Sequence, residues 1–277
     1  MSSIGKLVRK SQAVMFWCMR VLPKAKREAV YTLYAFCKHI DNVIDGNLDK
    51  EEKLEIFNAW QEELVNIYDK KVPLSNIGRK IYKNCMRFKI CKEDFKQILS
   101  SAMMNFPEYI KAPDYENFYK YCYGLVEIPM YITLSIMGVL DEKQRRELSQ
   151  NFGRAIFITD VLKDIKDDAM RGRLYLPVEL LRQANITSKD PLTVVTDKNL
   201  ISVRETLSRD VSVCFEKAFN TLQCTDRKIT RPLRFILHIY KRYFDIMQNR
   251  GWEIISPKPI IGFKDKVAIV YKVVFDK

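Results

Sequence analysis

Two segments of this sequence carry aspartates at the spacing of one helical turn. Asp41 and Asp45 end an otherwise apolar stretch, and Asp160, Asp164 and Asp168 form a second series with apolar neighbours. Residues four apart on a helix lie on one face, about 5–6 Å apart, where like charges repel each other. A carboxylate among apolar residues needs a cationic partner or a metal ion. Both series are therefore predicted to bind cations.

Carboxylate clusters of this kind suit Mg²⁺, which takes one or two carboxylates and completes its shell with water and substrate phosphate. Mn²⁺ is an alternative ion. Basic residues accompany both series: Lys38 precedes the first, Lys163 lies within the second and Arg171 follows it. Arg grips phosphate through two hydrogen bonds, and Lys acts as a point charge. The pattern predicts two acidic stripes that face each other across a cavity and hold a diphosphate through Mg²⁺.

Helices are expected to position these residues, because apolar residues recur with helical periodicity and the chain has few Gly (9) or Pro (10). The 277 residues suffice for one large core, so we predict an all-α fold in a single domain, 1–277. The segment after Gly251 is less regular, and 267–275 fits a strand or a short packed helix. The expected helices span about 24–45, 49–69, 75–88, 92–105, 115–137, 141–170, 198–222 and 230–250.

The charge balance points to an anionic partner. Lys and Arg number 47 against 34 Asp and Glu, a net charge of +13. The basic residues are dispersed and no zinc-finger, RNP or basic-zipper pattern occurs, so a nucleic-acid partner is not expected. A phosphorylated substrate and peripheral contact with an anionic membrane surface remain. We expect neither a signal peptide nor a transmembrane helix. The seven cysteines, without a C-x-x-C pair, indicate reduced thiols and a cytoplasmic protein. The net charge adds the expectation of a peripheral position at the inner membrane face.

Several segments together resemble the squalene/phytoene synthase family. The resemblance runs from about Leu22 to Tyr240, and the order and spacing of its pieces make it specific. It implies an isoprenoid-synthase-type helical bundle around a deep central cavity. The pieces are Leu22-Pro23 with Arg27, Tyr34–Lys38 leading into Asp41–Asp45, Tyr121–Gly124, and Asp160–Asp168 followed by Arg171–Pro177, close to the family pattern RGRxYLP.

The resemblance also implies roles for individual residues. Tyr121 matches the family's active-site tyrosine, and it joins Asp41 and Asp164 as the catalytic candidates. The residues that would contact the diphosphate are Lys38, Lys163, Arg171 and Tyr240. The residues that would organise Mg²⁺ are Asp41, Asp45, Asp160, Asp164 and Asp168.

The implied reaction joins two prenyl diphosphates of the farnesyl or geranylgeranyl class head to head. It passes through a cyclopropyl diphosphate to a C30 or C40 isoprenoid such as squalene, dehydrosqualene or phytoene. The sequence contains no G-x-G-x-x-G fingerprint, so an NADPH-dependent reductive step has no support in it.

The chain departs from the family pattern at several positions. Asn42 replaces an Asp, Asp160 stands where Asn is frequent, and Lys38 and Lys163 stand where Arg is common. The largest departure is the segment 125–130, which stands where the family has a stretch of small residues. This segment contains Glu127 and Pro129.

These last two residues are candidates for selecting the product. Pro129 predicts a helix kink, and Glu127 adds a carboxylate among apolar neighbours. Glu127 would act on the product if it faces the cavity. Otherwise it pairs with a cation, is protonated or faces solvent.

Two further functions stay open from the sequence. One is a class I-type terpene cyclase, or prenyl transfer to another acceptor, because the segment 125–130 is altered. The other is a catalytically silent family member that acts as an assembly factor. A silent member would have no reason to keep five unfavourably spaced carboxylates, which favours an enzyme.

Overall fold

The computed structural model describes residues 18–104, 111–139 and 141–275. Every named secondary-structure element in these ranges is a helix. Within them, β-type pairing is limited to one isolated bridge between Lys111 and Leu174. The all-α prediction is confirmed. The α-helices are Lys24–Asp45 (α3), Lys50–Val65 (α4), Asn76–Phe88 (α5), Lys92–Met103 (α6), Tyr115–Cys122 (α7), Ile128–Met137 (α8), Glu142–Met170 (α9), Val178–Gln183 (α10), Pro191–Thr196 (α11), Leu200–Gln223 (α12), Arg227–Arg250 (α13) and Phe263–Phe275 (α14). Two π-helical turns, Asn66–Lys70 (η1) and Tyr123–Glu127 (η2), extend α4 and α7.

Aspartate caps begin several of these helices. The Asp49 side chain accepts the Glu52 N–H at 2.8 Å, and the Glu52 carboxylate accepts the Asp49 N–H at 2.9 Å. Asp141 caps α9 in the same way by accepting the Gln144 N–H at 3.1 Å. Such caps satisfy N–H groups that have no partner inside the helix, and they stabilise the helix start by about 1 kcal/mol.

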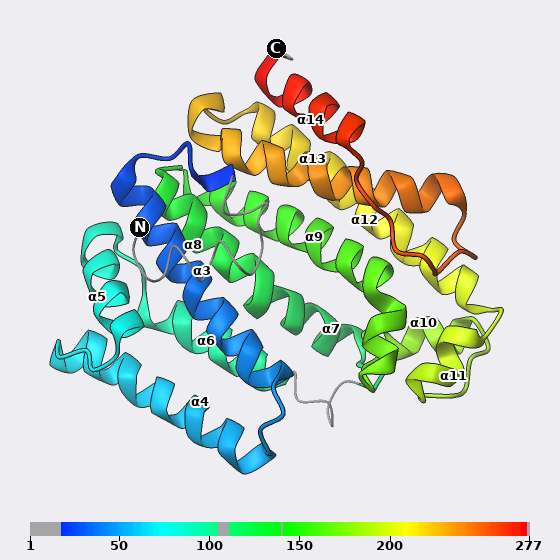
Figure 1. Cartoon of the computed structure of the whole chain (residues 1–277), viewed down its shortest axis with the longest axis horizontal. Helices are drawn as coiled ribbons and strands as arrows, with labels where there is room; N and C mark the ends of the chain where they lie inside the picture. Colours follow the sequence, from blue (N-terminus) through cyan, green and yellow to red (C-terminus); the bar gives the residue numbers. More distant parts are fainter. Residues whose placement is uncertain (1–17, 105–110, 140, 276–277) are drawn as a thin grey trace.

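The long helix α9 runs through the middle of the molecule, between α3 and α8 on one side and α12 and α13 on the other (Figure 1). It packs against α8, η2, α12 and α13. The last helix, α14, lies at the outer edge and contacts α13. In the described part of the chain, no helix has both the length and the apolarity needed to cross a membrane.

The predicted helix 115–137 is interrupted by η2. Pro129 lies in the first turn of α8, directly after this π-helical turn, where a missing N–H is tolerated. Two glycines let η2 approach its neighbours. A Cβ on Gly153 of α9 would lie 2.8 Å from Glu127 Cγ, and one on Gly124 would lie 1.8 Å from Ser101 Oγ of α6. The disturbance expected at Pro129 is therefore a π-helical turn held by close backbone packing.

Two short helices were not predicted, and the terminal segment takes one of its two predicted alternatives. The helices α10 and α11 have six residues each, too few for a periodic pattern to be recognised. The segment 267–275, which fitted either a strand or a packed helix, belongs to the helix α14 that begins at Phe263. The single domain predicted over 1–277 includes ends outside the described residues and stays a prediction.

Candidate active site

The two aspartate segments come together through Arg173. Asp41 and Asp45 lie on the last turns of α3, whereas Asp168 lies on the last turn of α9, five residues before Arg173. The buried Arg173 donates from Nη1 to Asp45 Oδ1 at 2.7 Å. Its charge also lowers the pKa values of Asp41 and Asp168 against the effect of burial. One guanidinium therefore interacts with aspartates at the ends of both α3 and α9, so the two acidic segments lie close together.

Lys163 and Tyr240 both reach the start of the second aspartate series. The Lys163 ammonium donates to Asp160 and lies 3.4 Å from Asp164 Oδ2. The Tyr240 hydroxyl, on α13, donates to Asp160 Oδ2 at 3.2 Å. Lys163 Nζ also lies 5.2 Å from the centre of the Tyr243 ring, within the range of a cation–π contact. The structure thus brings together four of the predicted residues from two helices, namely Asp160, Lys163, Asp164 and Tyr240.

Two of the carboxylates, Asp41 and Asp168, have pKa values well above the usual range. Burial, together with the neighbouring Asp45, raises the pKa of Asp41 to about 6, although Lys38 and Arg173 lower it. Burial and the neighbouring Asp164 raise the pKa of Asp168 to about 6, although Arg173 and Arg171 lower it. Lys38 and Arg171 are therefore within electrostatic reach of the site. Ionised carboxylates with raised pKa values gain free energy when a cation binds.

Two buried donors lie beside this cluster without a hydrogen-bond partner in the described chain. They are the Tyr121 hydroxyl and the Arg173 Nε–H. Tyr121 is 3% exposed, and its ring packs edge-on against that of Tyr175, with 5.9 Å between the ring centres. The positive charge of Arg173 acts on its hydroxyl group. Buried polar groups are almost always paired, so donors of this kind indicate where a ligand would bring an oxygen.

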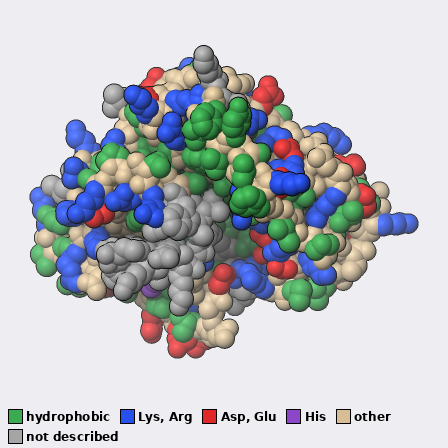
Figure 2. Space-filling view, turned by 45° about the horizontal axis from the view of Figure 1, so that its top comes forward, with side chains coloured by type: hydrophobic (Ala, Val, Ile, Leu, Met, Phe, Trp, Pro, Cys, Tyr) green, Lys and Arg blue, Asp and Glu red, His purple; other side chains and the backbone are tan. Residues whose placement is uncertain are grey.

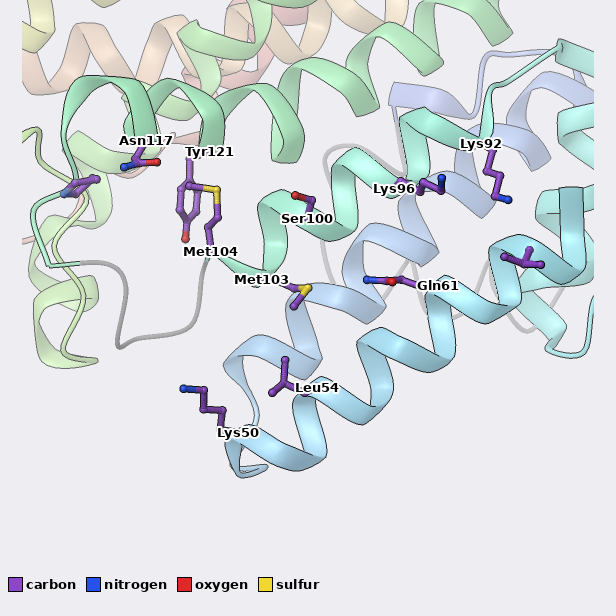
Figure 3. Close-up of a pocket in the computed structure, with 12 residues that line it drawn as sticks. Lys50, Leu54, Gln61, Lys92, Lys96, Ser100, Met103, Met104, Asn117 and Tyr121 are labelled. Carbon is purple, nitrogen blue, oxygen red and sulfur yellow. The ribbon is translucent and has the colours of Figure 1, made fainter. Parts of the chain in front are cut away.

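A cavity of about 940 Å³ opens from Tyr121 between α4, α6 and α7. Figure 3 shows Tyr121 and Met104 at one end of it and Lys92 and Lys96 at the other. Leu54 and Met103 line the wall between these ends. The volume and the mixed lining are typical of small-molecule sites. Among the described lining residues, Tyr121 alone belongs to the predicted site.

The donor set fits Mg²⁺ bound together with a phosphate-bearing substrate. Among the residues that the structure describes, no three Asp, Glu, His or Cys side chains form a group that could hold a metal ion alone. Mg²⁺ usually takes one or two carboxylates and fills the rest of its shell with water and phosphate oxygens. The carboxylate pairs on α3 and α9 and the two unpaired donors beside them are consistent with that mode.

Lys258 was missed by the sequence reasoning. It lies on the loop between α13 and α14, donates to Asp164 and lies 2.6 Å from Asp167 Oδ2. The fully buried Arg204 holds the start of this loop by donating to the carbonyl oxygens of Trp252 and Ile254. Lys258 is 94 residues from Asp164, so no local spacing could reveal the contact. Its position between two prolines, which stiffen the loop, was the one available signal.

Glu127 takes one of the alternatives left open by the sequence, pairing with a cation. It is 5% exposed, and Arg154 Nε donates to its Oε1 at 3.1 Å. The Arg154 guanidinium in turn lies 4.5 Å from the centre of the Tyr119 ring. These three residues line a separate hollow of about 520 Å³, which shares no described lining residue with the cavity at Tyr121. A product-selecting role for Glu127 or Pro129 stays a prediction.

Comparison with known proteins gives the family. The squalene/phytoene synthase family model matches residues 8–263. The chain belongs to the squalene/phytoene synthase family. A presqualene diphosphate synthase of Rhodopseudomonas palustris is 30% identical over 91% of this chain and 89% of the relative. A presqualene diphosphate synthase of Sinorhizobium fredii is 29% identical over 84% of this chain and 83% of the relative. A 15-cis-phytoene synthase of Synechococcus elongatus is 21% identical over 87% and 81%.

Solved structures show the same fold. A dehydrosqualene synthase superposes with a TM-score of 0.84 at 19% identity, covering 98% of this chain and 93% of that one. A squalene synthase from Alicyclobacillus acidocaldarius gives 0.80 at 18% identity, covering 90% and 93%. The predicted isoprenoid-synthase-type bundle is confirmed, and so is the prediction of a prenyltransferase. Family membership supports head-to-head prenyl diphosphate condensation as the class of reaction.

Proposed function

We propose that this enzyme joins two farnesyl-class diphosphates head to head in a Mg²⁺-dependent reaction and forms a cyclopropyl diphosphate. The observation that carries the proposal is the meeting of α3 and α9 at Arg173, with the unpaired Tyr121 hydroxyl beside it. Acidic side chains from two helices, basic side chains among them and an adjoining cavity are what a prenyl diphosphate needs.

Different side chains would bind the diphosphate and the prenyl chain of the substrate. Lys38, Lys163, Arg171 and Tyr240 would hold the diphosphate, and the five aspartates on α3 and α9 would hold Mg²⁺. Bound Mg²⁺ supplies charge neutralisation of the leaving diphosphate, which lowers the barrier to C–O ionisation. Leu54 and Met103 would bury the prenyl chain and exclude water from the allylic cation. The Tyr121 hydroxyl would donate to an oxygen of the bound substrate.

The relatives favour release of the cyclopropyl diphosphate as the product. The two with 30% and 29% identity are named presqualene diphosphate synthases, whereas the phytoene synthase above is 21% identical. Joining two prenyl diphosphates into a cyclopropyl diphosphate releases one diphosphate. Continuing to a hydrocarbon releases a second. The ratio of released diphosphate to consumed substrate therefore distinguishes the two end points.

The test incubates purified protein with Mg²⁺ and C10, C15 or C20 prenyl diphosphate and measures released diphosphate and product mass. We expect the C15 substrate, one diphosphate per two substrates and a C30 product that still carries a diphosphate. Release of two diphosphates per two substrates with an extractable hydrocarbon would support a product of the dehydrosqualene or phytoene type instead, because the assay supplies no reductant and the final cation can only lose a proton. A product of one chain length would support a cyclase, and no release with any substrate would reject the proposal.

Variants connect this activity to the aspartates. Asp41→Ala and Asp164→Ala should abolish diphosphate release while the helical circular dichroism remains. Glu51→Ala and Glu55→Ala are matched controls, because these two exposed carboxylates on α4 have the same four-residue spacing. Near-normal turnover in either aspartate variant would contradict the metal site, and unfolding of both would mean that the aspartates are structural.

A further inference from the structure

Helix α14 leaves most of its apolar surface uncovered. Ile269 and Val273 alone among its apolar side chains are buried, and an ion pair from Arg242 to Asp265 at 2.9 Å fixes the start of the helix to α13. The rest of the helix faces away from the protein: Phe263 is 81% exposed and Tyr271 62%. The large exposed apolar residues follow helical spacing and are Phe263, Val267, Val270, Tyr271, Val274 and Phe275. We call this set the α14 face.

A basic recess adjoins the α14 face. It lies between α12, α13 and α14, has a volume of about 810 Å³, and includes Arg227, Arg234, Lys241 and Lys272 in its lining. The one carboxylate in the same lining, Asp245, is paired with Lys241. Lys272 lines both this recess and the surface hollow formed by the α14 face. The apolar and basic surfaces therefore share an edge.

We propose that α14 is a peripheral membrane-docking helix, whose apolar face enters the interface of an anionic bilayer while the basic recess binds lipid phosphates. Amphipathic helices with this combination lie in the interface rather than across it. The charge of the chain is complementary to such a surface, since it carries +13 overall and since Lys264 and Lys272 flank the α14 face. Figure 2 shows hydrophobic side chains gathered on the upper part of the molecule, the side of α14 in Figure 1, with basic side chains beside them.

An anionic bilayer fits this surface better than a second copy of the chain. Self-association through the α14 face would bring Lys264 and Lys272 of two strongly basic molecules together, and that repulsion opposes a dimer. A bilayer offers apolar chains and negative charge at once. The loop that leads into α14 also carries Lys258, which contacts Asp164 and Asp167. Docking through α14 would therefore bring lipid near the candidate active site.

This proposal goes beyond the reaction and is tested without turnover. Binding is measured by co-sedimentation with vesicles of phosphatidylcholine alone or mixed with phosphatidylglycerol. We expect binding to the mixed vesicles that weakens with salt. The double variant Val267→Ser, Val270→Ser should bind about tenfold more weakly, because two half-exposed apolar side chains no longer enter the interface. Its matched control is Val72→Ser, Val213→Ser, which alters two similarly exposed valines elsewhere and should bind like the wild type.

A second pair of variants tests the charges. Lys264→Gln, Lys272→Gln should weaken binding about fivefold per lysine at low salt, whereas Lys189→Gln, Lys198→Gln on the α10–α12 side should change it little. The proposal is overturned if wild-type protein ignores the mixed vesicles or binds both kinds equally. Equal losses in the matched controls would also overturn it. A lipid-free dimer that the Val267→Ser, Val270→Ser variant dissociates would identify a second copy as the occupant instead.

Discussion

Replacing Glu127 by Gln and by Ala separates its charge from its shape. The carboxylate is buried and paired with Arg154, whose side chain is 30% exposed. Removing one partner of a fully buried ion pair costs about 3–5 kcal/mol. Because water can reach Arg154, we expect about 2 kcal/mol for Glu127→Ala, from the unpaired guanidinium and the lost packing. Glu127→Gln keeps an oxygen at the position that accepts from Arg154, so its cost should stay below about 1 kcal/mol.

The loss in free energy of unfolding caused by Glu127→Gln should also depend on pH, and the sign of the dependence follows from the pKa of Glu127. Burial raises the pKa of Glu127, although Arg154 and Cys122 act against the increase. The folded protein therefore holds the proton more tightly than the unfolded chain does. Stability of the wild type relative to the Gln variant must then fall as pH rises from the unfolded pKa through the folded one. The penalty for Glu127→Gln is largest below this window and shrinks above it.

Urea unfolding at about pH 4.5 and about pH 7.5 measures both effects, and a Glu127–Arg154 double-mutant cycle isolates the pair. Glu142 is the matched control: it pairs with Arg146 at 2.6 Å, but its side chain is 60% exposed. If Glu127→Ala costs no more than Glu142→Ala, the ion pair does not hold η2 against α9. If Glu127→Gln changes the product but neither stability nor diphosphate release, Glu127 selects the product after all.

Three further outcomes follow from buried contacts. Gly124→Ala should destabilise the fold by more than about 2 kcal/mol in thermal unfolding, because its Cβ would overlap Ser101; an unchanged melting temperature would mean that α6 and η2 are not packed closely. Tyr121→Phe should leave the ligand-free protein equally stable or about 1 kcal/mol more stable in urea while lowering turnover, and a stability loss would reveal a partner for its hydroxyl. Arg204→Met should cost about 2 kcal/mol and speed proteolysis of the loop after Trp252, and an unchanged cleavage rate would contradict its anchoring role.

The helices that carry the aspartates could be predicted because their signals are local. The stripe of apolar residues gave the bounds of α3 as the structure has them, and the predicted start of α9 at residue 141 lies one residue before Glu142, where the structure begins the helix. Residues four apart share a helix face whatever the tertiary structure, so the acidic stripes followed from spacing alone. The resemblance to the family then added Tyr240, which the structure places at Asp160.

Features that depend on tertiary contacts could not be predicted in the same way. The π-helical turn η2 exists beside Gly124 and Gly153, whose neighbours belong to other helices. Arg154 reaches Glu127 from 27 residues away, and Lys258 reaches Asp164 from 94. The segment Val267–Phe275 was ambiguous because a short apolar run fits a strand or a helix equally well, and no sequence pattern tells which of its faces lacks a partner.

The cations already present among the aspartates predict that metal and diphosphate bind together. Lys163 and Lys258 both contact Asp164, so an incoming Mg²⁺ must displace ammonium groups from that carboxylate. A diphosphate offers those ammonium groups new partners, so its presence should strengthen metal binding, and linkage requires the reverse effect to be equal. Titration with Mn²⁺, followed by its electron paramagnetic resonance, should therefore show tighter binding with inorganic diphosphate than without it, beyond the affinity of diphosphate alone for the ion. Lys258→Met should tighten Mn²⁺ binding in the absence of diphosphate and reduce the coupling. Equal affinities with and without diphosphate would mean that Lys163 and Lys258 do not compete with the metal.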